Sequence, residues 1–390
     1  MQNHSSRLGK AGALSLLLAA CPTIMVGCVL APGLPGIAPA LGVPHAASWL
    51  VTLPSLGVVL FGGVSGRFLT KVGAYRALCY GLVLYAVLGA GAVMLHGPIP
   101  VFADRILLGG ATVIVMAAGT TLISEFFSGA ARLAVIARQG VAIEIGGVIF
   151  LSIGGMLARI GWAGPFALYL VALLILAMVL AFVPNQVPSP VAEVSICSAT
   201  QTGETTSIFG AAFLSMLCFF TAIIVLPFRL TTGLGQVAFS ESEVGYVLSF
   251  VSVVAVVVAA VMPRIIRRVG ASFTFVLAFS AYALAHLCFA LAVDPAMLFA
   301  GTVLLGTGFG LSTPLVNHMT IERSDATARG RNLALLSVAI FLGQFASSFM
   351  ELVPGGHSIP FYLAAGVSAI TAIAWSIRSR PAPNIDRTSA

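Results

Sequence analysis

Long runs of apolar residues dominate the chain and are separated by short polar stretches. Each run is close to the ~20 residues that a helix needs to cross the ~30 Å hydrocarbon core of a bilayer. Polar and apolar side chains do not alternate within the runs, which argues against a membrane β-barrel. The pattern therefore predicts an all-α integral membrane protein with twelve transmembrane helices. The expected spans are 11–31, 48–69, 74–95, 98–122, 137–158, 164–184, 208–230, 243–264, 271–293, 295–317, 332–353 and 359–378.

The composition supports lipid as the solvent. Apolar residues make up 59% of the chain and Asp, Glu, Lys and Arg only 8%, whereas a water-facing surface is usually about a quarter charged. Arg7 and Lys10 precede the first span, as basic residues precede a signal peptide. Because eleven more spans follow, we expect the first span to be retained.

The placement of basic residues predicts the orientation, because Lys and Arg near span ends are held on the cytoplasmic side. With a cytoplasmic amino terminus, Arg159 and Arg229 lie outside, Arg105 lies within the fourth span, and the remaining Lys and Arg residues lie inside. We expect both termini to be cytoplasmic, in a bacterial-type plasma (inner) membrane. The net charge of +7 then reflects this topology and the anionic inner leaflet, so no nucleic-acid partner is expected.

Soluble catalysis and ATP-driven pumping have no support in the sequence. It contains no phosphate-binding Gly-rich loop with its Lys, no metal-ligand spacing, and no loop large enough to hold a Ser, His and Asp site. The six cysteines lie mostly in apolar spans, where they behave as small hydrophobic residues. We therefore do not expect an enzyme or a cofactor. We expect the energy to come from an ion gradient or from the gradient of the solute itself.

An internal repeat at an offset of 197 residues indicates a duplicated architecture. Charged and glycine landmarks keep this register through several spans, which shared hydrophobicity would not produce. The matches pair Arg67, Lys71 and Gly73 with Arg264, Arg268 and Gly270, Gly109 with Gly306, Arg132 with Arg329, and Gly146 with Gly343. We predict two pseudo-symmetric six-helix bundles, 1–184 and 208–380, a cytoplasmic linker 185–207 and a cytoplasmic tail 381–390. Parallel repeats of this kind place the solute site between the halves, near mid-membrane.

The loop between spans two and three carries a family resemblance. It reads Gly66-Arg67-Phe68-Leu69-Thr70-Lys71-Val72-Gly73-Ala74-Tyr75-Arg76. This stretch is similar to the Gly-x-x-x-Asp-Arg-x-Gly-Arg-Arg gate motif of the major facilitator superfamily, which the chain resembles over essentially its whole length. The resemblance implies a cytoplasmic gate formed by Gly66, Arg67, Thr70, Lys71, Gly73 and Arg76, with Arg264, Arg268 and Gly270 in the second half. Thr70 replaces the Asp and offers only a neutral hydrogen bond, so the latch is weaker or uses other residues.

Span four contains Arg105-Ile106-Leu107-Leu108-Gly109, which resembles the family's Arg-x-x-Gln-Gly motif with Leu108 in place of Gln. An arginine within hydrocarbon costs at least ~2.5 kcal/mol by insertion scales, so it should face the bundle interior or a wet cavity. The resemblance links this Arg to proton coupling. Alternatively, Arg105 is structural and pairs with a neighbouring carboxylate or backbone carbonyls while extending outward beside Asp104.

Span five resembles the Gly-x-x-x-Gly-Pro-x-x-Gly-Gly signature of the superfamily's exporters, although Phe150 and Leu151 replace its central Gly-Pro. Gly140, Gly147 and Gly154 repeat every seven residues and form a stripe of small residues that lets another helix approach closely. The resemblance to the signature indicates antiport, whereas simple helix packing explains each individual glycine better. The residues concerned are Gly140, Gly146, Gly147, Gly154 and Gly155.

Glu144 lies on the same stripe and is the only carboxylate well inside a span. Because desolvation disfavours the ionised form, its carboxyl could exchange a proton near neutral pH. Glu144 is therefore the main proton-carrier candidate, with Arg105 and Asp104 as further coupling candidates. The alternative is a structural carboxylate paired with Arg138 or with a basic group of another span.

Several polar and aromatic residues of the spans are candidates to line a central cavity. Span seven carries Phe209, Phe213, Phe219 and Phe220 in a run, which suits an amphipathic solute, although lipid contact explains the run slightly better. His286 is expected to be packed or hydrogen-bonded rather than to relay protons. The cavity candidates are Thr23, Thr120, Phe213, Phe220, Asn317 and Gln344.

These features predict a secondary transporter that works by alternating access. The exporter resemblance favours efflux of a small amphipathic compound or metabolite by proton antiport. The first alternative is proton-coupled uptake of a sugar or organic anion, and the remote one is a non-transporting receptor. The expected partners are a small-molecule substrate, a proton and the bilayer, and a monomer is sufficient because the family has one pore per chain.

Overall fold

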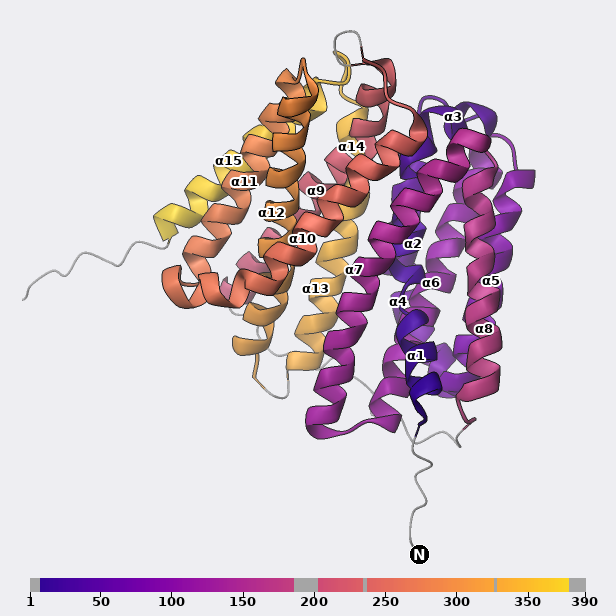
Figure 1. The fold of residues 1–390 in the computed structure, drawn as a ribbon. Helices are drawn as coiled ribbons and strands as arrows, with labels where there is room; N and C mark the ends of the chain where they lie inside the picture. The colour runs from indigo at the N-terminus through magenta and orange to yellow at the C-terminus, as the bar shows by residue number, and fades with distance from the viewer. Residues whose placement is uncertain (1–7, 186–202, 234–236, 326–327, 379–390) are drawn as a thin grey trace, which may run out of the picture.

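The computed structural model describes residues 8–185, 203–233, 237–325 and 328–378, and every long element in these ranges is a helix (Figure 1). The predicted linker and tail, with Cys197, Arg380 and Arg387, lie largely outside the described residues. The first half contains α1 Lys10–Leu18, α2 Pro22–Cys28, η1 Ala31–Gly33, α3 Leu34–Ala40, α4 Trp49–Val72, α5 Ala74–Gly91, η2 Ala92–Met94, α6 Pro98–Phe126, α7 Gly129–Ile160, η3 Gly164–Leu170 and α8 Val171–Phe182. The second half contains α9 Gly203–Thr232, α10 Glu241–Val269, α11 Ala271–Leu291, α12 Pro295–Glu322, α13 Arg329–Ala346, α14 Ser348–Glu351 and α15 Ile359–Arg378.

Twelve helices or helical runs of the described chain are long and apolar enough to cross a membrane, as the sequence predicts. The first differs from its expected range of 11–31, because it continues to Ala40 as the broken series α1, α2, η1 and α3. Pro22, Pro32 and Pro35 each stand in the first turn of one of these segments. A proline is tolerated there, where its missing N–H would have no helical partner. The prolines therefore divide the span without ending it.

The internal repeat is visible in the backbone. Gly73 ends α4 with φ 82° and ψ 150°, and Gly270 ends α10 with φ 80° and ψ 161°. A Cβ on Gly109 would come closer than 3.0 Å to the Pro54 carbonyl oxygen, and one on Gly306 would stand 2.6 Å from the Val251 oxygen. Both pairs of positions are related by the 197-residue offset. The two halves are therefore pseudo-symmetric copies of one six-span unit.

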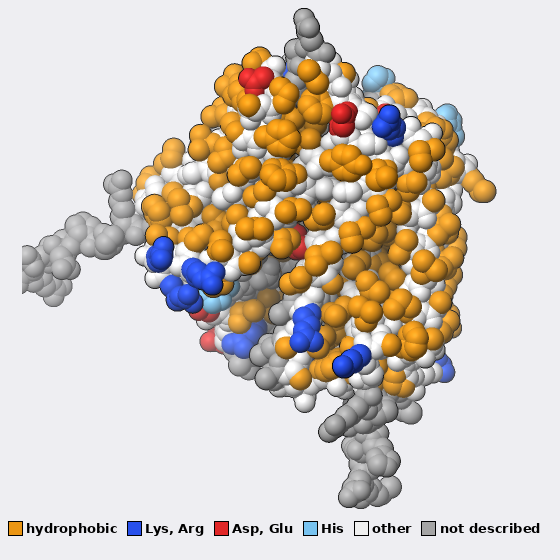
Figure 2. All heavy atoms as spheres, viewed as in Figure 1, with side chains coloured by type: hydrophobic (Ala, Val, Ile, Leu, Met, Phe, Trp, Pro, Cys, Tyr) orange, Lys and Arg blue, Asp and Glu red, His pale blue; other side chains and the backbone are white. Residues whose placement is uncertain are grey.

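The halves lie side by side, with α1–α8 on one side of Figure 1 and α9–α15 on the other. Because the chain crosses the membrane twelve times, the start of α1 and the end of α15 lie on the same face, which we call the terminal face. Residues 41–48 and 352–358 join spans on the opposite face, the far face. Hydrophobic side chains cover most of the surface seen in Figure 2, as lipid contact requires.

Candidate functional site

The two halves meet closely along α7 and α10. A Cβ on Gly155 would stand 3.0 Å from the Gly245 Cα and 2.5 Å from the Glu241 carbonyl oxygen. The hydroxyls of Ser152 and Ser249 share a hydrogen bond across the same boundary at 2.7 Å, and the Ser249 hydroxyl also lies 3.0 Å from the Val148 carbonyl oxygen. Glycine allows the backbones to approach, and the serines bond across the contact.

The same two helices separate toward the terminal face. A Cβ on Gly147 would be 3.9 Å from the Ser252 Oγ of α10, and one on Gly140 would meet nothing within 4 Å. Figure 2 shows the surface hollowed between the halves at this end, with Lys and Arg side chains on both sides of the hollow. A cleft between the halves therefore opens to the terminal face.

On the far face the halves remain joined. The Ser48 backbone N–H, at the start of α4, donates to the Glu351 Oε2 of α14 at 3.0 Å. Trp49 packs edge-on against Phe349, with 6.5 Å between ring centroids. These two contacts join the halves on this side, whereas the cleft between them opens to the terminal face.

Glu144 lies on the side of α7 that faces this boundary. Gly147, three residues further on, contacts both α2, at Ile24, and α10, at Ser252. Ser152 contacts α10, and Glu144 lies eight residues, or about 12 Å of helix, nearer the terminal face. At the level of Glu144 the helices α7 and α10 have begun to separate. Its side chain is half-buried and has no hydrogen bond or ion pair with any residue that the structure describes. Arg138 is exposed and does not pair with it.

Arg105 is fully buried within the first half and belongs to a closed set of contacts. Its Nη2 and Nε donate to the Asp104 Oδ2 at 2.7 and 3.1 Å. Nη2 also donates to the Leu88 carbonyl at 3.4 Å, and Nη1 to the Tyr169 hydroxyl at 3.5 Å. The guanidinium carbon lies 5.8 Å and 5.6 Å from the ring centroids of Phe166 and Tyr169. All these partners come from the first half, and none comes from the cleft boundary.

Thr120 and Asn317, two of the cavity candidates, occupy equivalent places in α6 and α12. The positions differ by the 197-residue offset, and both side chains are exposed. The Thr120 hydroxyl donates to the Met116 carbonyl at 2.9 Å, and the Asn317 Nδ2 donates to the Thr313 carbonyl at 3.0 Å. Each side chain therefore makes the same bond, four residues back along its own helix, and is otherwise exposed.

Gln344 and Phe220 converge on α2 at the boundary between the halves. A Cβ on Gly27 would be 2.8 Å from the Gln344 Nε2 and 3.5 Å from the Phe220 ring. Thr23, one turn earlier in α2, is half-buried and donates to the Ala20 carbonyl at 2.6 Å, and Phe213 is also half-buried.

The expectation of lipid contact for the aromatic run of span seven is wrong for Phe219 and Phe220. Each has only 4% of its surface exposed. Phe219 stacks on Phe309 of α12, with 3.9 Å between ring centroids, and meets Phe220 edge-on. The same apolar residue types occur on lipid-facing surfaces and in the protein core, so composition alone could not tell which of the two environments these side chains occupy. His286 is fully buried, with its Nε2 3.0 Å from the Cys218 carbonyl oxygen, which confirms the expected packing.

The gate-motif residues are spread over the terminal face. The side chains of Arg67, Lys71 and Arg76 are exposed at the turn between α4 and α5, and those of Arg264 and Arg268 at the end of α10. The Thr70 hydroxyl donates to the Arg67 carbonyl of its own helix at 2.8 Å. The described contacts of Thr70 do not connect the halves, as expected where the cleft is open.

The comparisons with known proteins agree with this architecture. The sequence model of the Major Facilitator Superfamily matches residues 16–206 and 208–390, one match in each half. The chain belongs to the major facilitator superfamily. This superfamily consists of transporters, so the protein is a transporter of small molecules rather than an enzyme. A search of curated proteins found no match.

Solved structures of superfamily transporters share the fold. The nucleoside transporter NupG is similar with a TM-score of 0.72 at 12% identity, covering 95% of this chain and 99% of its own. A peptide transporter POT in complex with sulfate gives 0.74 at 14% identity, covering 94% of each chain. A POT family transporter in complex with 5-aminolevulinic acid gives 0.77 at 11% identity, covering 96% of this chain and 98% of its own.

Ser48 and Glu351, which hold the far face closed, were not predicted as functional residues. They are 303 positions apart, so no local pattern connects them. One signal was present, because Glu351 is a carboxylate in the last turn of an apolar span, and an ionisable residue in such a place is often functional.

Proposed function

We propose that this superfamily member exports a small amphipathic compound in exchange for protons, by alternating access, and that Glu144 carries the proton. The observation that supports this proposal is an unpaired carboxylate about halfway along α7, on the side that faces the cleft between the two halves. A carboxylate without a cationic partner is free to bind a proton or release it, whereas an ion pair would fix it in the charged form.

The orientation belongs to the same proposal. Basic residues concentrate at the terminal face, which we assign to the cytoplasm of a bacterial-type inner membrane. The cleft is then open inward, the state in which an exporter collects its substrate. Each proton that enters down a membrane potential of 100 mV supplies about 2.3 kcal/mol, which can drive the reset of the cycle.

Arg105 and Asp104 have a supporting part in this scheme. Their bonds stay within the first half, so we assign them to holding that half as a rigid body. The gate residues Arg67, Lys71, Arg264 and Arg268 are proposed to close the cytoplasmic side when the halves rock. The half boundaries 1–184 and 208–380 remain our assignment of the rocking units.

The direct test uses inverted membrane vesicles and a panel of fluorescent amphipathic compounds. Accumulation driven by an acidic vesicle interior supports antiport, whereas uptake into right-side-out vesicles along an inward proton gradient would support symport instead. Glu144→Gln should abolish gradient-driven accumulation while preserving exchange of labelled for unlabelled substrate. Glu125→Gln, which changes an exposed carboxylate of α6, is the matched control. Full gradient-driven transport by Glu144→Gln would overturn the carrier role.

A further inference from the structure

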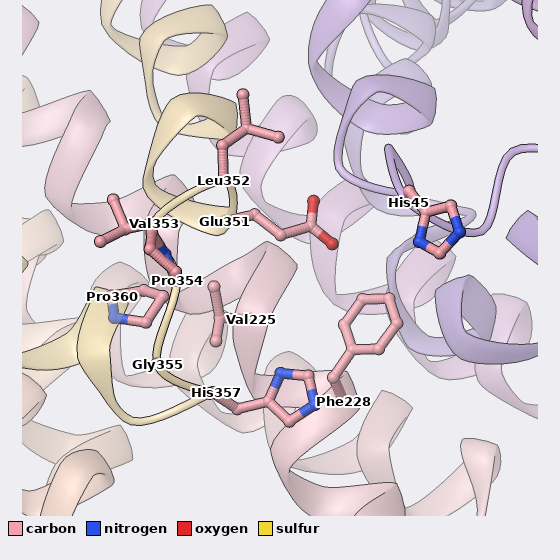
Figure 3. Close-up of a pocket in the computed structure, with 11 residues that line it drawn as sticks. His45, Val225, Phe228, Glu351, Leu352, Val353, Pro354, Gly355, His357 and Pro360 are labelled. Atoms are coloured by element: carbon pink, nitrogen blue, oxygen red, sulfur yellow. The ribbon is translucent and has the colours of Figure 1, made fainter.

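A second cavity lies on the far face, away from the cleft. Its volume is about 370 Å³, within the range of about 300–1,000 Å³ typical of small-molecule sites. His45 comes from the first half, and Phe228, Glu351 and His357 come from the second. Figure 3 shows the Glu351 carboxylate pointing across the cavity toward His45, with Phe228 and His357 to one side. The cavity therefore spans both halves.

The described lining of this cavity contains an acidic side chain but no Lys or Arg. Glu351 is the only Asp or Glu among the described lining residues. One carboxylate oxygen accepts from Ser48, and the other has no hydrogen-bond partner among the described residues. Arg229, next to Phe228 in the chain, instead donates to the carbonyls of Gly233 and Ala292 at 3.2 and 3.1 Å. The negative charge is therefore open to a ligand.

The remaining walls are aromatic and apolar. The rings of Phe228 and His357 stack with centroids 5.7 Å apart and an interplanar angle of 21°. Val225, Leu352 and Pro360 add apolar surface. A carboxylate binds ammonium groups by charge-assisted hydrogen bonds, and an aromatic ring attracts both cations and flat apolar groups. Neutral histidines can accept further bonds from an ammonium.

We propose that this cavity is a second binding site, separate from the cleft, for a small aromatic ammonium compound. Its ammonium group bonds to Glu351 and its ring packs against Phe228 and His357. Because His45 and Ser48 belong to one half and Glu351 to the other, the site is complete only while the far face is closed. A ligand that binds one state better shifts the population toward that state. Occupancy therefore holds the transporter open to the terminal face and slows its cycle.

Binding to the full-length protein in lipid nanodiscs tests the site. The probe is 1-naphthylmethylammonium, and its uncharged counterpart is 1-naphthylmethanol. At about pH 7.5, calorimetry should show the ammonium binding about tenfold or more tightly than the alcohol. Glu351→Gln should remove that difference, and Phe228→Leu should weaken both probes. Each variant is checked for an unchanged melting temperature.

Glu144→Gln distinguishes the two sites, because it alters the cleft and leaves the far-face cavity intact. The probe should bind this variant as it binds the parent protein. Loss of binding in Glu144→Gln with retention in Glu351→Gln would place the probe in the cleft and overturn the proposal. Equal affinity for ammonium and alcohol, or no measurable binding, would overturn it as well. None of these results bears on proton coupling, which the vesicle experiment tests separately.

Discussion

Gly155 of α7 and Gly245 of α10 lie directly opposite each other where the two halves meet. A Cβ on Gly155 would stand 3.0 Å from the Gly245 Cα, and a Cβ on Gly245 would stand 3.1 Å from the Gly155 Cα. Fifteen residues earlier in α7, a Cβ on Gly140 would meet no atom within 4 Å. One glycine-rich helix therefore has a closed end and an open end, which is the geometry that alternating access needs.

Gly155→Val should prevent the far face from closing. The added side chain would meet backbone atoms of α10, which cannot rotate away as a side chain can. We expect transport to fall at least about tenfold, since a shift of 1.4 kcal/mol between two states already changes their ratio tenfold. Ser48, whose side chain is fully buried, should become reactive as Ser48→Cys toward a membrane-impermeant maleimide.

Gly140→Ala is the control for this change, because its methyl group would enter open space. It should leave both transport and the labelling of Ser48→Cys unchanged. If Gly155→Val transported at the parent rate with its far-face cysteine still protected, the glycine contact would not limit closure.

The buried pair Arg105–Asp104 should stabilise the first half rather than carry protons. Arg105→Met should lower the free energy of unfolding by about 3–5 kcal/mol, because it leaves the Asp104 charge buried without its partner. Asp104 retains only 8% of its side-chain surface. The double change Arg105→Met with Asp104→Asn should restore much of this loss. Thermal unfolding in detergent of the parent, both single variants and the double variant measures the coupling.

A direct coupling role for Arg105 predicts a different result. The double variant would then be stable but would have lost its response to a pH gradient in vesicles. Recovery of gradient-driven transport together with stability supports the structural role.

The elements that the sequence predicted well depend on local properties. Span length and apolar content determined the number of helices, and the repeat of Gly73 at Gly270 located equivalent turns. Hydrogen bonds between the two halves could not be predicted from the sequence. Those of Ser48 with Glu351 and of Ser152 with Ser249 depend on how the two bundles pack together. The contact of Arg105 with Asp104 was anticipated as one of two alternatives. Adjacent helix residues do not normally face each other, and here the long arginine side chain makes the contact possible.

The first span shows why the ends of a transmembrane helix are harder to predict than its presence. Pro32 and Pro35 come just after the predicted end of this span at residue 31, yet each occupies the first turn of a new helical segment, and Pro39 lies inside α3. The burial of Phe219 could not be predicted either, because its partner Phe309 lies in another helix of the same half.

Gly73 and Gly270 should be sensitive to alanine for reasons of backbone strain alone. Their φ angles of 82° and 80° with ψ near 150–161° fall in a region open to glycine but not to residues with a Cβ. A Cβ on Gly270 would meet nothing within 4 Å, so a steric clash with neighbours is not involved. Gly270→Ala should cost about 1–3 kcal/mol of stability, and Gly73→Ala should cost a similar amount.

Gly62→Ala provides the comparison, because Gly62 is helical and also has open space around it. Alanine is the better helix former by about 1 kcal/mol, so this variant should melt at the parent temperature or above it. Equal melting of Gly62→Ala and Gly270→Ala would show that the α10–α11 turn tolerates a side chain.

Thr120 and Asn317 should affect substrate affinity without affecting stability. Each side chain is exposed and bonds only to a carbonyl of its own helix, so its loss should change the free energy of unfolding by no more than about 0.5 kcal/mol. If both face the solute from equivalent places in the two halves, Thr120→Val and Asn317→Leu should each raise the KM for transport several-fold. The maximal rate should change less, because neither residue holds the halves together.

The repeat also makes a prediction about the pair. Positions in separate halves that contact the same solute lose affinity additively when they do not touch each other, so the double variant should show the product of the two KM changes. Ser376→Ala is a suitable control, since this exposed hydroxyl also bonds only to its own helix, at the Ile373 carbonyl, but on the last span. Its KM should match the parent value. A KM unchanged in both Thr120→Val and Asn317→Leu would remove α6 and α12 from the proposed cavity lining and place recognition on Gln344 and Phe220, where α2, α9 and α13 converge.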